Sequence, residues 1–194
     1  MYYFLLFMIY SFFGWCFECI HMAITTKEVV NRGFLNGPYI PIYGVGLTLI
    51  TVFLSKFKSN FISLLLLSIL IIGVLEYFVS YILEKIFKIR WWDYSNRKFN
   101  LNGRICLNTM SIFITGAMLI IYLVHPIIDN ILINLSNKMT IILFLLLLIM
   151  LLIDVIISVV FTIKFSKSKN KSDRLDKTPE IKVFIKNFFA QKCK

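Results

Sequence analysis

The chain has 194 residues, of which 59% are hydrophobic and 16% are charged, and its mean hydropathy is +0.81. Soluble domains average about 45–50% apolar and about 25% charged residues, so the composition excludes an ordinary soluble enzyme, a disordered chain and a secreted disulfide-rich mini-protein. Lysine and arginine total 21 against 10 acidic residues, which gives a net charge of +11. Because the basic residues lie in short segments beside apolar runs, we expect anionic lipid head groups as their partners and no nucleic acid.

Five apolar runs predict an all-α fold, a polytopic membrane bundle of five transmembrane helices, since about 20 apolar residues cross a bilayer. The runs cover 1–24, 39–55, 60–84, 105–124 and 139–163. The first run lacks a basic start and a small-residue cleavage site, so we expect a retained helix and not a signal peptide. The fourth run is expected to end at His125-Pro126. Residues 127–135 are too short to cross, and an interfacial turn or a helix extension is expected there.

The distribution of basic residues predicts how these helices are oriented. The segments after the first, third and fifth helices hold 18 of the 21 lysines and arginines, and the other two segments hold 3. The larger group belongs on the cytoplasmic side. We therefore expect a plasma-membrane protein with its N-terminus outside and its C-terminus in the cytoplasm.

The chain divides into a transmembrane bundle, residues 1–163, and a basic cytoplasmic tail, residues 164–194. From Pro179 onward, apolar residues recur at helical spacing between lysines. The residues that share one face are Ile181, Phe184, Ile185 and Phe188. This pattern is typical of an amphipathic helix lying on the inner leaflet.

A glycine and a glutamate on one helix, followed by Asn-Gly at the start of the next, occur twice in the same direction. The two sets are Gly14, Glu18, Asn36 and Gly37, and Gly73, Glu76, Asn102 and Gly103. The recurrence predicts a parallel internal repeat of helices 1–2 and 3–4, an arrangement found among transporters. With two short matches, coincidence is the alternative.

Three acidic residues lie inside apolar runs, where a charge costs about 2.5–3.5 kcal/mol. They are Glu18, Glu76 and Asp154. A glycine lies beside each glutamate, Gly14 beside Glu18 and Gly73 beside Glu76, and it allows another helix to approach closely. For the two glutamates, one interpretation is a polar site for a substrate or a proton near the cytoplasmic side, and the other is a bridge to the nearby Arg32, Arg90 and Arg104 that fixes helix packing. Asp154 has only Ser158 as a polar companion on its helix face, and either role is open for it.

The two basic loops carry further polar and aromatic residues. Trp91 and Trp92 fit an interfacial aromatic belt, but Asp93 between aromatic residues indicates a shaped polar site or a docking surface. Glycines in both loops permit tight turns, while Asn, Arg and Tyr offer hydrogen bonds to an anionic group. The candidate substrate-binding residues are Glu18, Arg32, Asn36, Tyr39, Tyr43, Glu76, Trp92, Asp93, Tyr94, Asn102 and Arg104.

The sequence contains no glycine-rich phosphate loop ending in Gly-Lys-Ser/Thr and no His-Glu-x-x-His motif. Cys16-x-x-Cys19 with His21 is a weak zinc pattern within an apolar helix, and helix packing is the better interpretation of these cysteines. No cofactor, metal or disulfide framework is expected.

Four sequence strings carry a resemblance to a known family. They are GWCFE, NRGFLNGPYIPIYG, LEYFVSYILEKIFKIRWWDYS and FNLNGRICL. Together, over about residues 8–126, they resemble the CmpB-like type IV ABC-transporter permeases. The resemblance implies an integral membrane permease component, and no substrate. Its signature positions are the candidate residues above together with Gly33, Gly37, Pro41, Gly44, Trp91 and Gly103.

Three functional hypotheses from different classes follow. The first is a transport component that pairs with itself and with a separate ATPase, which would dock on residues 90–104. The second is a membrane enzyme acting on a lipid head group, with Glu18, Glu76 and Asp93 as acid, base or metal ligands and with Arg32 and Arg104 holding phosphate. The third is a structural or regulatory membrane protein. We favour the first.

Overall fold

The computed structural model describes residues 1–27, 31, 33–88 and 90–168, without the side chains of Thr26 and of residues 164–168. The fold is mostly helical, as predicted. The helices are α1 (Tyr2–Thr26), α2 (Pro41–Leu54) with the 3₁₀ turn η1 (Ser55–Phe57), α3 (Phe61–Phe87), α4 (Leu107–Leu119), the π turn η2 (Ile120–Val124), α5 (His125–Ile133) and α6 (Asn137–Ser168). Two short strands, β1 (Asn100–Leu101) and β2 (Ile105–Cys106), pair antiparallel. The amphipathic helix expected after Pro179 lies outside the described residues.

Four of the five expected crossings correspond to helices that are long and apolar enough to span a membrane. They are α1, α3, the continuous segment from α4 to α5, and α6. The fifth, α2, has 14 residues and reaches 17 only with η1. This length is at the lower limit for crossing a bilayer. The sequence thus predicted the apolar segments correctly, whereas α2 is shorter than a typical membrane span.

The expected end of the fourth helix at His125-Pro126 is wrong. The π turn η2 continues α4, and α5 then begins at His125 with Pro126 in its first turn. A proline is tolerated in the first turn because its missing N–H group needs no intrahelical partner. A π-helix, where it occurs, is mostly a single turn inside an α-helix, as it is here. Residues 127–133 therefore extend the helix and do not form an interfacial turn.

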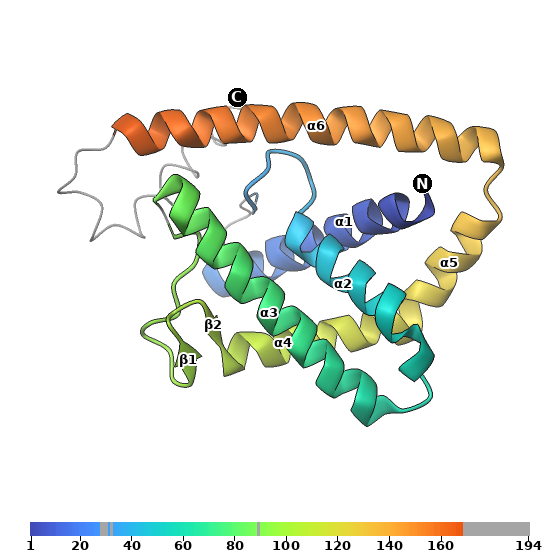
Figure 1. Cartoon of the computed structure of the whole chain (residues 1–194), viewed down its shortest axis with the longest axis horizontal. Helices are drawn as coiled ribbons and strands as arrows, with labels where there is room; N and C mark the ends of the chain where they lie inside the picture. The colour runs from blue at the N-terminus through green and yellow to red at the C-terminus, as the bar shows by residue number, and fades with distance from the viewer. Residues whose placement is uncertain (28–30, 32, 89, 169–194) are drawn as a thin grey trace.

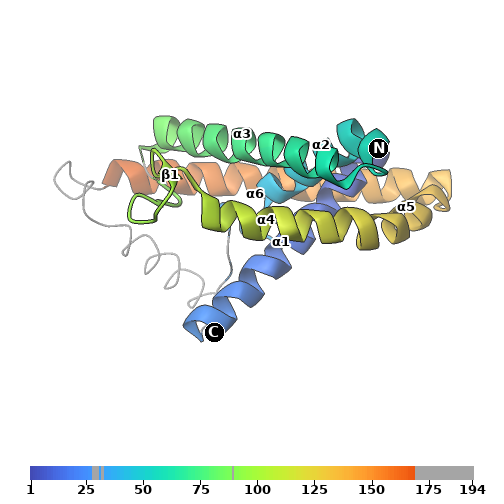
Figure 2. The ribbon, with the colours of Figure 1, turned by 90° about the horizontal axis from the view of Figure 1, so that it is seen from below.

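The core lies where α1, α2, α3 and η2 meet. Leu6, Ile50, Leu64 and Ile121, one from each of these elements, are almost completely inaccessible to solvent. Figure 1 shows these elements crossing beneath α6, and Figure 2 shows α1 running at a steep angle to α3 and α4.

Helix α6 lies along one edge of the molecule and begins just after α5 (Figure 1). Its apolar residues point in all directions, and most of them are exposed. Its contacts with the bundle include an edge-to-face ring pair between Phe144 and Phe4, whose centroids are 5.1 Å apart. A helix that is apolar on every face is suited to lipid contact.

The tightest helix approach joins α1 to α2 at Gly44. A Cβ atom at this position would overlap the Ser11 hydroxyl and the Phe7 carbonyl oxygen of α1. The Ser11 carbonyl also accepts a hydrogen bond of 2.9 Å from the backbone N–H of Ile40, just before α2. Only a residue without a side chain allows the two helices to lie this close.

We therefore expect Gly44→Ala to destabilise the protein, because overpacking of a tight contact costs about 1–3 kcal/mol. Gly116→Ala is the matched control, since a Cβ atom there would meet nothing within 4 Å and alanine favours helix over glycine. The thermal unfolding midpoint in detergent should fall for Gly44→Ala and should hold or rise for Gly116→Ala. Equal midpoints for the two variants would contradict this account of the α1–α2 contact.

Candidate functional site

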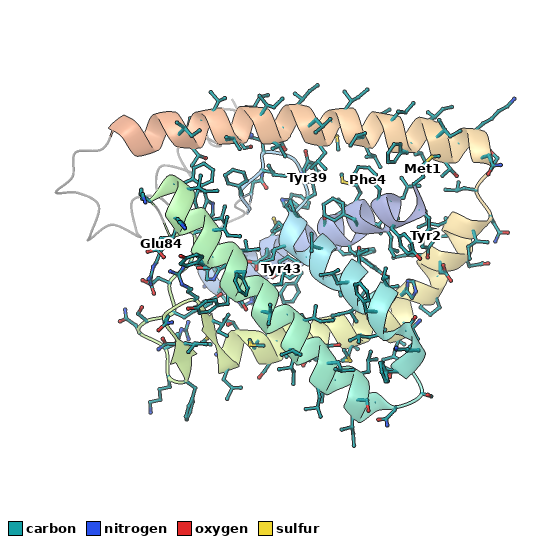
Figure 3. The ribbon with its side chains drawn as sticks, viewed as in Figure 1. Met1, Tyr2, Phe4, Tyr39, Tyr43 and Glu84 are labelled. Atoms are coloured by element: carbon teal, nitrogen blue, oxygen red, sulfur yellow. The ribbon has the colours of Figure 1, made fainter. Side chains whose placement is uncertain are left out.

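Four candidate residues from three helices and a loop come together in what we term the acid–tyrosine cluster: Glu18, Tyr43, Glu76 and Tyr94. The Tyr43 hydroxyl donates a hydrogen bond of 2.6 Å to Oε1 of Glu18. Glu76 interacts electrostatically with Glu18, and the side chain of Tyr94 lies against Glu76. Figure 3 shows Tyr43 on α2 where it crosses α1 and α3.

Glu76 is the most deeply buried of these residues, with 4% of its surface exposed. Its Oε2 atom is inaccessible and has no hydrogen-bond partner among the described residues. An acceptor left unpaired in an apolar interior is costly. The cluster therefore offers an open acceptor for a proton or for a donor group of a ligand.

Glycines beside the two glutamates allow the neighbouring helices to approach. A Cβ atom on Gly14 would overlap the side chain of Tyr43, and one on Gly73 would come within 3.1 Å of Cε of Met110. In each case, the glycine lies on the helix that carries the glutamate and meets a side chain of the next helix. The sequence predicted these close approaches from the Gly-Glu pairs.

Tyr94 reaches Glu76 from the loop between α3 and α4. Its backbone N–H donates a hydrogen bond of 2.7 Å to the carbonyl oxygen of Gly103, which joins the residues after α3 to the hairpin. Burial, and then the negative charge of Glu76, raise the pKa of the Tyr94 hydroxyl above its usual range. Tyr94 therefore remains a neutral hydroxyl at physiological pH.

A second set of residues, the Glu84 ion network, consists of Glu84, Arg90, Asp93 and Arg104. Figure 3 shows Glu84 near the end of α3. Glu84 pairs with Nε of Arg90 at 3.0 Å and with Nη2 of Arg104 at 2.6 Å. Arg104 also donates to Oγ of Ser80 at 3.2 Å, and Arg90 lies 3.5 Å from Asp93. These two arginines, expected near Glu18 and Glu76, are thus held by Glu84.

Asp93 organises its own loop. It accepts hydrogen bonds from the backbone N–H of Ser95 at 2.9 Å and from its hydroxyl at 2.6 Å. Burial acts to raise the pKa of Asp93, but the Ser95 hydrogen bonds and the charge of Arg90 outweigh it and hold the pKa below its usual value. Asp93 is therefore ionised at neutral pH and is engaged by its neighbours.

Trp92 and Asn102 support the hairpin around Arg104. Trp92 Nε1 donates to the Arg104 carbonyl oxygen at 2.8 Å, and Asn102 Nδ2 donates to the Tyr77 hydroxyl at 2.9 Å. Gly103 has a left-handed φ of 67°, and a Cβ atom there would overlap Asp93. The short hairpin was not expected from the sequence.

Asn36 and Tyr39 lie in a third place, the Asp154 anchor, which joins the loop before α2 to α6. Asp154 accepts hydrogen bonds from Nδ2 of Asn36 at 2.9 Å, from the backbone N–H of Gly37 at 2.8 Å and from the Tyr39 hydroxyl at 2.7 Å. Burial, followed by the hydrogen bond to Asp154, raises the pKa of Tyr39 above its usual range, so the hydroxyl remains a donor. Ser158 adds a hydrogen bond to Asp154 at 3.2 Å.

The candidate residues are therefore distributed over three sites instead of one. Arg32, the remaining candidate, lies outside the described residues. Sequence reasoning missed the partners of Asp154, and its one signal was an aspartate with a serine one turn later in an apolar helix. It also missed the role of Glu84, whose signal was a glutamate shortly before Arg90.

A fourth polar set lies at the other end of the bundle and was not expected. The Tyr10 hydroxyl lies 2.8 Å from Nδ1 of His125, which is buried, and the Tyr2 hydroxyl donates to Asp129. These contacts join α1 to α5. Across the part of the chain that the structure describes, no three His, Cys, Asp or Glu residues are grouped as they would be around a metal ion.

The chain matches, over residues 5–159, the family described as "Putative ABC-transporter type IV". The match spans well over half of the chain, so the protein belongs to this family, and the resemblance seen in its motifs is confirmed. With four membrane-length apolar helices among its described residues, it is a multi-pass membrane protein of the ABC-transporter type. No curated protein and no solved structure matches the chain.

The Asp154 anchor gives a direct test of how α6 is held. We expect Asp154→Ala to lower the free energy of unfolding by about 1–3 kcal/mol, because the buried Tyr39 hydroxyl and the half-buried donors of Asn36 and Gly37 lose their acceptor. Hydrogen–deuterium exchange at the Gly37 amide should also accelerate. Ser158→Ala is the milder variant and should have a smaller effect, since it removes the 3.2 Å hydrogen bond to Asp154 and the 2.8 Å hydrogen bond from Nδ2 of Asn36 but keeps the carboxylate. If both variants exchange at the wild-type rate, the anchor does not hold the loop.

Proposed function

We propose that the protein is the membrane-spanning permease subunit of an ABC transporter, and that the acid–tyrosine cluster is the polar site for its substrate or for a coupled proton. The observation that carries this proposal is the Oε2 atom of Glu76, which is buried and unpaired among the described residues. Ionisable groups kept inside a membrane bundle mark transport and proton pathways. Glu84, which holds the loop after α3, is paired with two arginines, whereas Glu76 is in no ion pair among the described residues.

Several features support a parallel repeat that would create this site. α1 and α3 each carry a glutamate and each end at a lysine in the left-handed conformation, with φ of 57° at both Lys27 and Lys88. The glycine beside each glutamate meets a side chain of the following helix. Two such units, related within one chain, bring their glutamates together between them, as in transporters built from repeats.

We further propose that residues 90–104 dock a separate ATPase subunit on the cytoplasmic side, and that the assembly contains a second copy of this chain. The Glu84 ion network gives this loop a fixed shape, which a docking surface needs. The sequence has no phosphate-binding loop of its own. Anionic lipids are the expected environment of the basic loops and tail.

The alternative of a lipid-head-group enzyme has less support. It requires Arg104 to hold phosphate, but this side chain is 10% exposed and is engaged by Glu84 and Ser80. Asp93, its expected acid or metal ligand, hydrogen-bonds Ser95 and lies in the separate Glu84 ion network.

The experiment that separates these functions is purification of the tagged chain in mild detergent from the cells that produce it. The transport proposal expects an ATP-hydrolysing subunit to co-purify in a fixed ratio, and its loss when residues 96–100 are replaced by a glycine-serine linker. A lone protein that changes the head groups of added phospholipids would contradict the proposal and support the enzyme.

For the complex, we expect Glu76→Gln to abolish substrate-stimulated ATP hydrolysis while the ATPase subunit still co-purifies, because the amide keeps the size of the side chain but removes its charge and its proton site. Glu76→Asp keeps the carboxyl group and should retain part of the stimulation. The measurement is ATPase activity in proteoliposomes. Full stimulation in the Glu76→Gln complex would remove the cluster from the mechanism.

A tag-accessibility experiment tests the orientation and the role of α2. If α2 with η1 crosses the membrane, tags at the N-terminus and after Lys56 are reached from outside, and tags near Arg97 and at Lys194 from the cytoplasm. If α2 does not cross, position 56 lies on the cytoplasmic side. The six basic residues after α3 would then lie outside, which contradicts the rule that basic residues are enriched in cytoplasmic loops. We expect the first result, and a cytoplasmic N-terminus would overturn it.

A further inference from the structure

A groove of about 530 Å³ lies between the hairpin loop and the beginning of α4. Its polar lining consists of Asn96, Arg97 and Lys98 from the loop and of Asn108 and Ser111 from α4. None of these five residues belongs to the acid–tyrosine cluster, the Glu84 ion network or the Asp154 anchor. Three of them, residues 96–98, lie in the segment 90–104 that is proposed to dock the ATPase subunit, so the groove concerns the side of this segment that faces the start of α4.

The cations of this loop divide into two kinds. Arg90 and Arg104 are neutralised by Glu84, and Arg90 also by Asp93. Arg97 and Lys98 form no ion pair with any residue of the described chain. Two unpaired cations at one groove, with amide and hydroxyl groups beside them, are complementary to a phosphate group.

Apolar side chains flank these cations. Phe99, which also lines the groove, is 81% exposed, and Leu107 at the start of α4 is 60% exposed. Phe99 has a left-handed φ of 54°, which is costly for a non-glycine residue. An exposed aromatic ring held in such a conformation, next to unpaired cations, is typical of a surface that contacts a membrane or another partner.

The position of the groove favours a lipid as its ligand. Leu107 is the first residue of the membrane-length segment Leu107–Ile133, so the groove lies at the depth where head groups meet acyl chains. In a bilayer, the phosphate of a phospholipid lies nearer the water and its acyl chains begin just below, at the depth of this groove. The aromatic ring and the leucine side chain fit the boundary region, and the two cations fit the phosphate.

We propose that this groove binds one anionic phospholipid, with its phosphate against Arg97 and Lys98 and its acyl chains along the start of α4. The other basic groove at this end of the molecule, lined by Lys85, Lys88 and Arg104, also contains Glu84. This carboxylate would repel a phosphate. The proposal thus assigns the lipid to one groove and not to every basic surface.

The test is native mass spectrometry of the full chain in detergent with added phosphatidylglycerol or phosphatidylcholine. Arg97→Gln/Lys98→Gln should lower the affinity for phosphatidylglycerol by about thirtyfold, the effect of two basic side chains beside an anionic surface, and should leave phosphatidylcholine unchanged. Lys56→Gln/Lys58→Gln removes the same charge from the loop after α2 and is the matched control. An equal loss in both double variants would overturn the proposal, because it would show a response to net charge only.

Two further measurements distinguish binding of a lipid from binding of free phosphate, and one of them uses a variant that keeps both cations. Phe99→Ser keeps both cations and should weaken phosphatidylglycerol binding, since it removes the apolar contact. Inorganic phosphate at millimolar concentration should not displace the lipid. Displacement by phosphate, or unchanged lipid binding in a folded Phe99→Ser variant, would contradict a phospholipid site. Because neither arm measures transport, a failure here leaves the permease proposal standing, and the reverse also holds.

Discussion

An ionised side chain placed among apolar helices must be given hydrogen-bond donors or an opposite charge, and this requirement shapes the whole bundle. Glu84 is met by two arginines, and Asp154 is met by the loop that precedes α2. The Asp154 pairing joins segments 118 residues apart, and the Glu84 pairing joins α3 to the loop that follows it. The loop between α3 and α4 folds back onto α3 through Glu84, and α6 is joined to the remainder of the bundle through Asp154.

Glu76 differs from these two acids. The residues around it are tyrosines and a second glutamate, and one of its oxygens has no partner in the described part of the chain. Glu84 and Asp154 show that this bundle can provide cations or hydrogen-bond donors to its acidic residues, and the described residues provide no such partner for Oε2 of Glu76. The unpaired oxygen is therefore interpreted as a functional feature, in the same way that strained or unsatisfied groups concentrate at functional sites.

The sequence predicted what depends on local pattern, and it did not predict what depends on long-range pairing. Apolar runs of sufficient length located the helices, and Gly-Glu spacing indicated where helices approach closely. The partner of Asp154 is 118 residues away in the sequence, and no local pattern reveals it. Arg104 was expected beside the glutamates of the bundle, but the hairpin that turns it toward Glu84 depends on the left-handed residues Asn102 and Gly103. Proline at 126 was interpreted as a helix end because a π turn before it leaves no clear signal in the residues.

In this account, Glu76 belongs to the functional site and Glu84 to a structural ion network. The most direct test compares the thermal unfolding midpoints of Glu76→Gln and Glu84→Gln in the same detergent. Glu84→Gln should lower the midpoint clearly, because Arg90 and Arg104 lose the charge that pairs with them. Glu76→Gln should leave the midpoint unchanged or raise it, because a neutral amide costs less to bury than a carboxylate without a cation. If Glu76→Gln destabilises the protein as much as Glu84→Gln does, Glu76 is a packing residue and the account of the site is wrong.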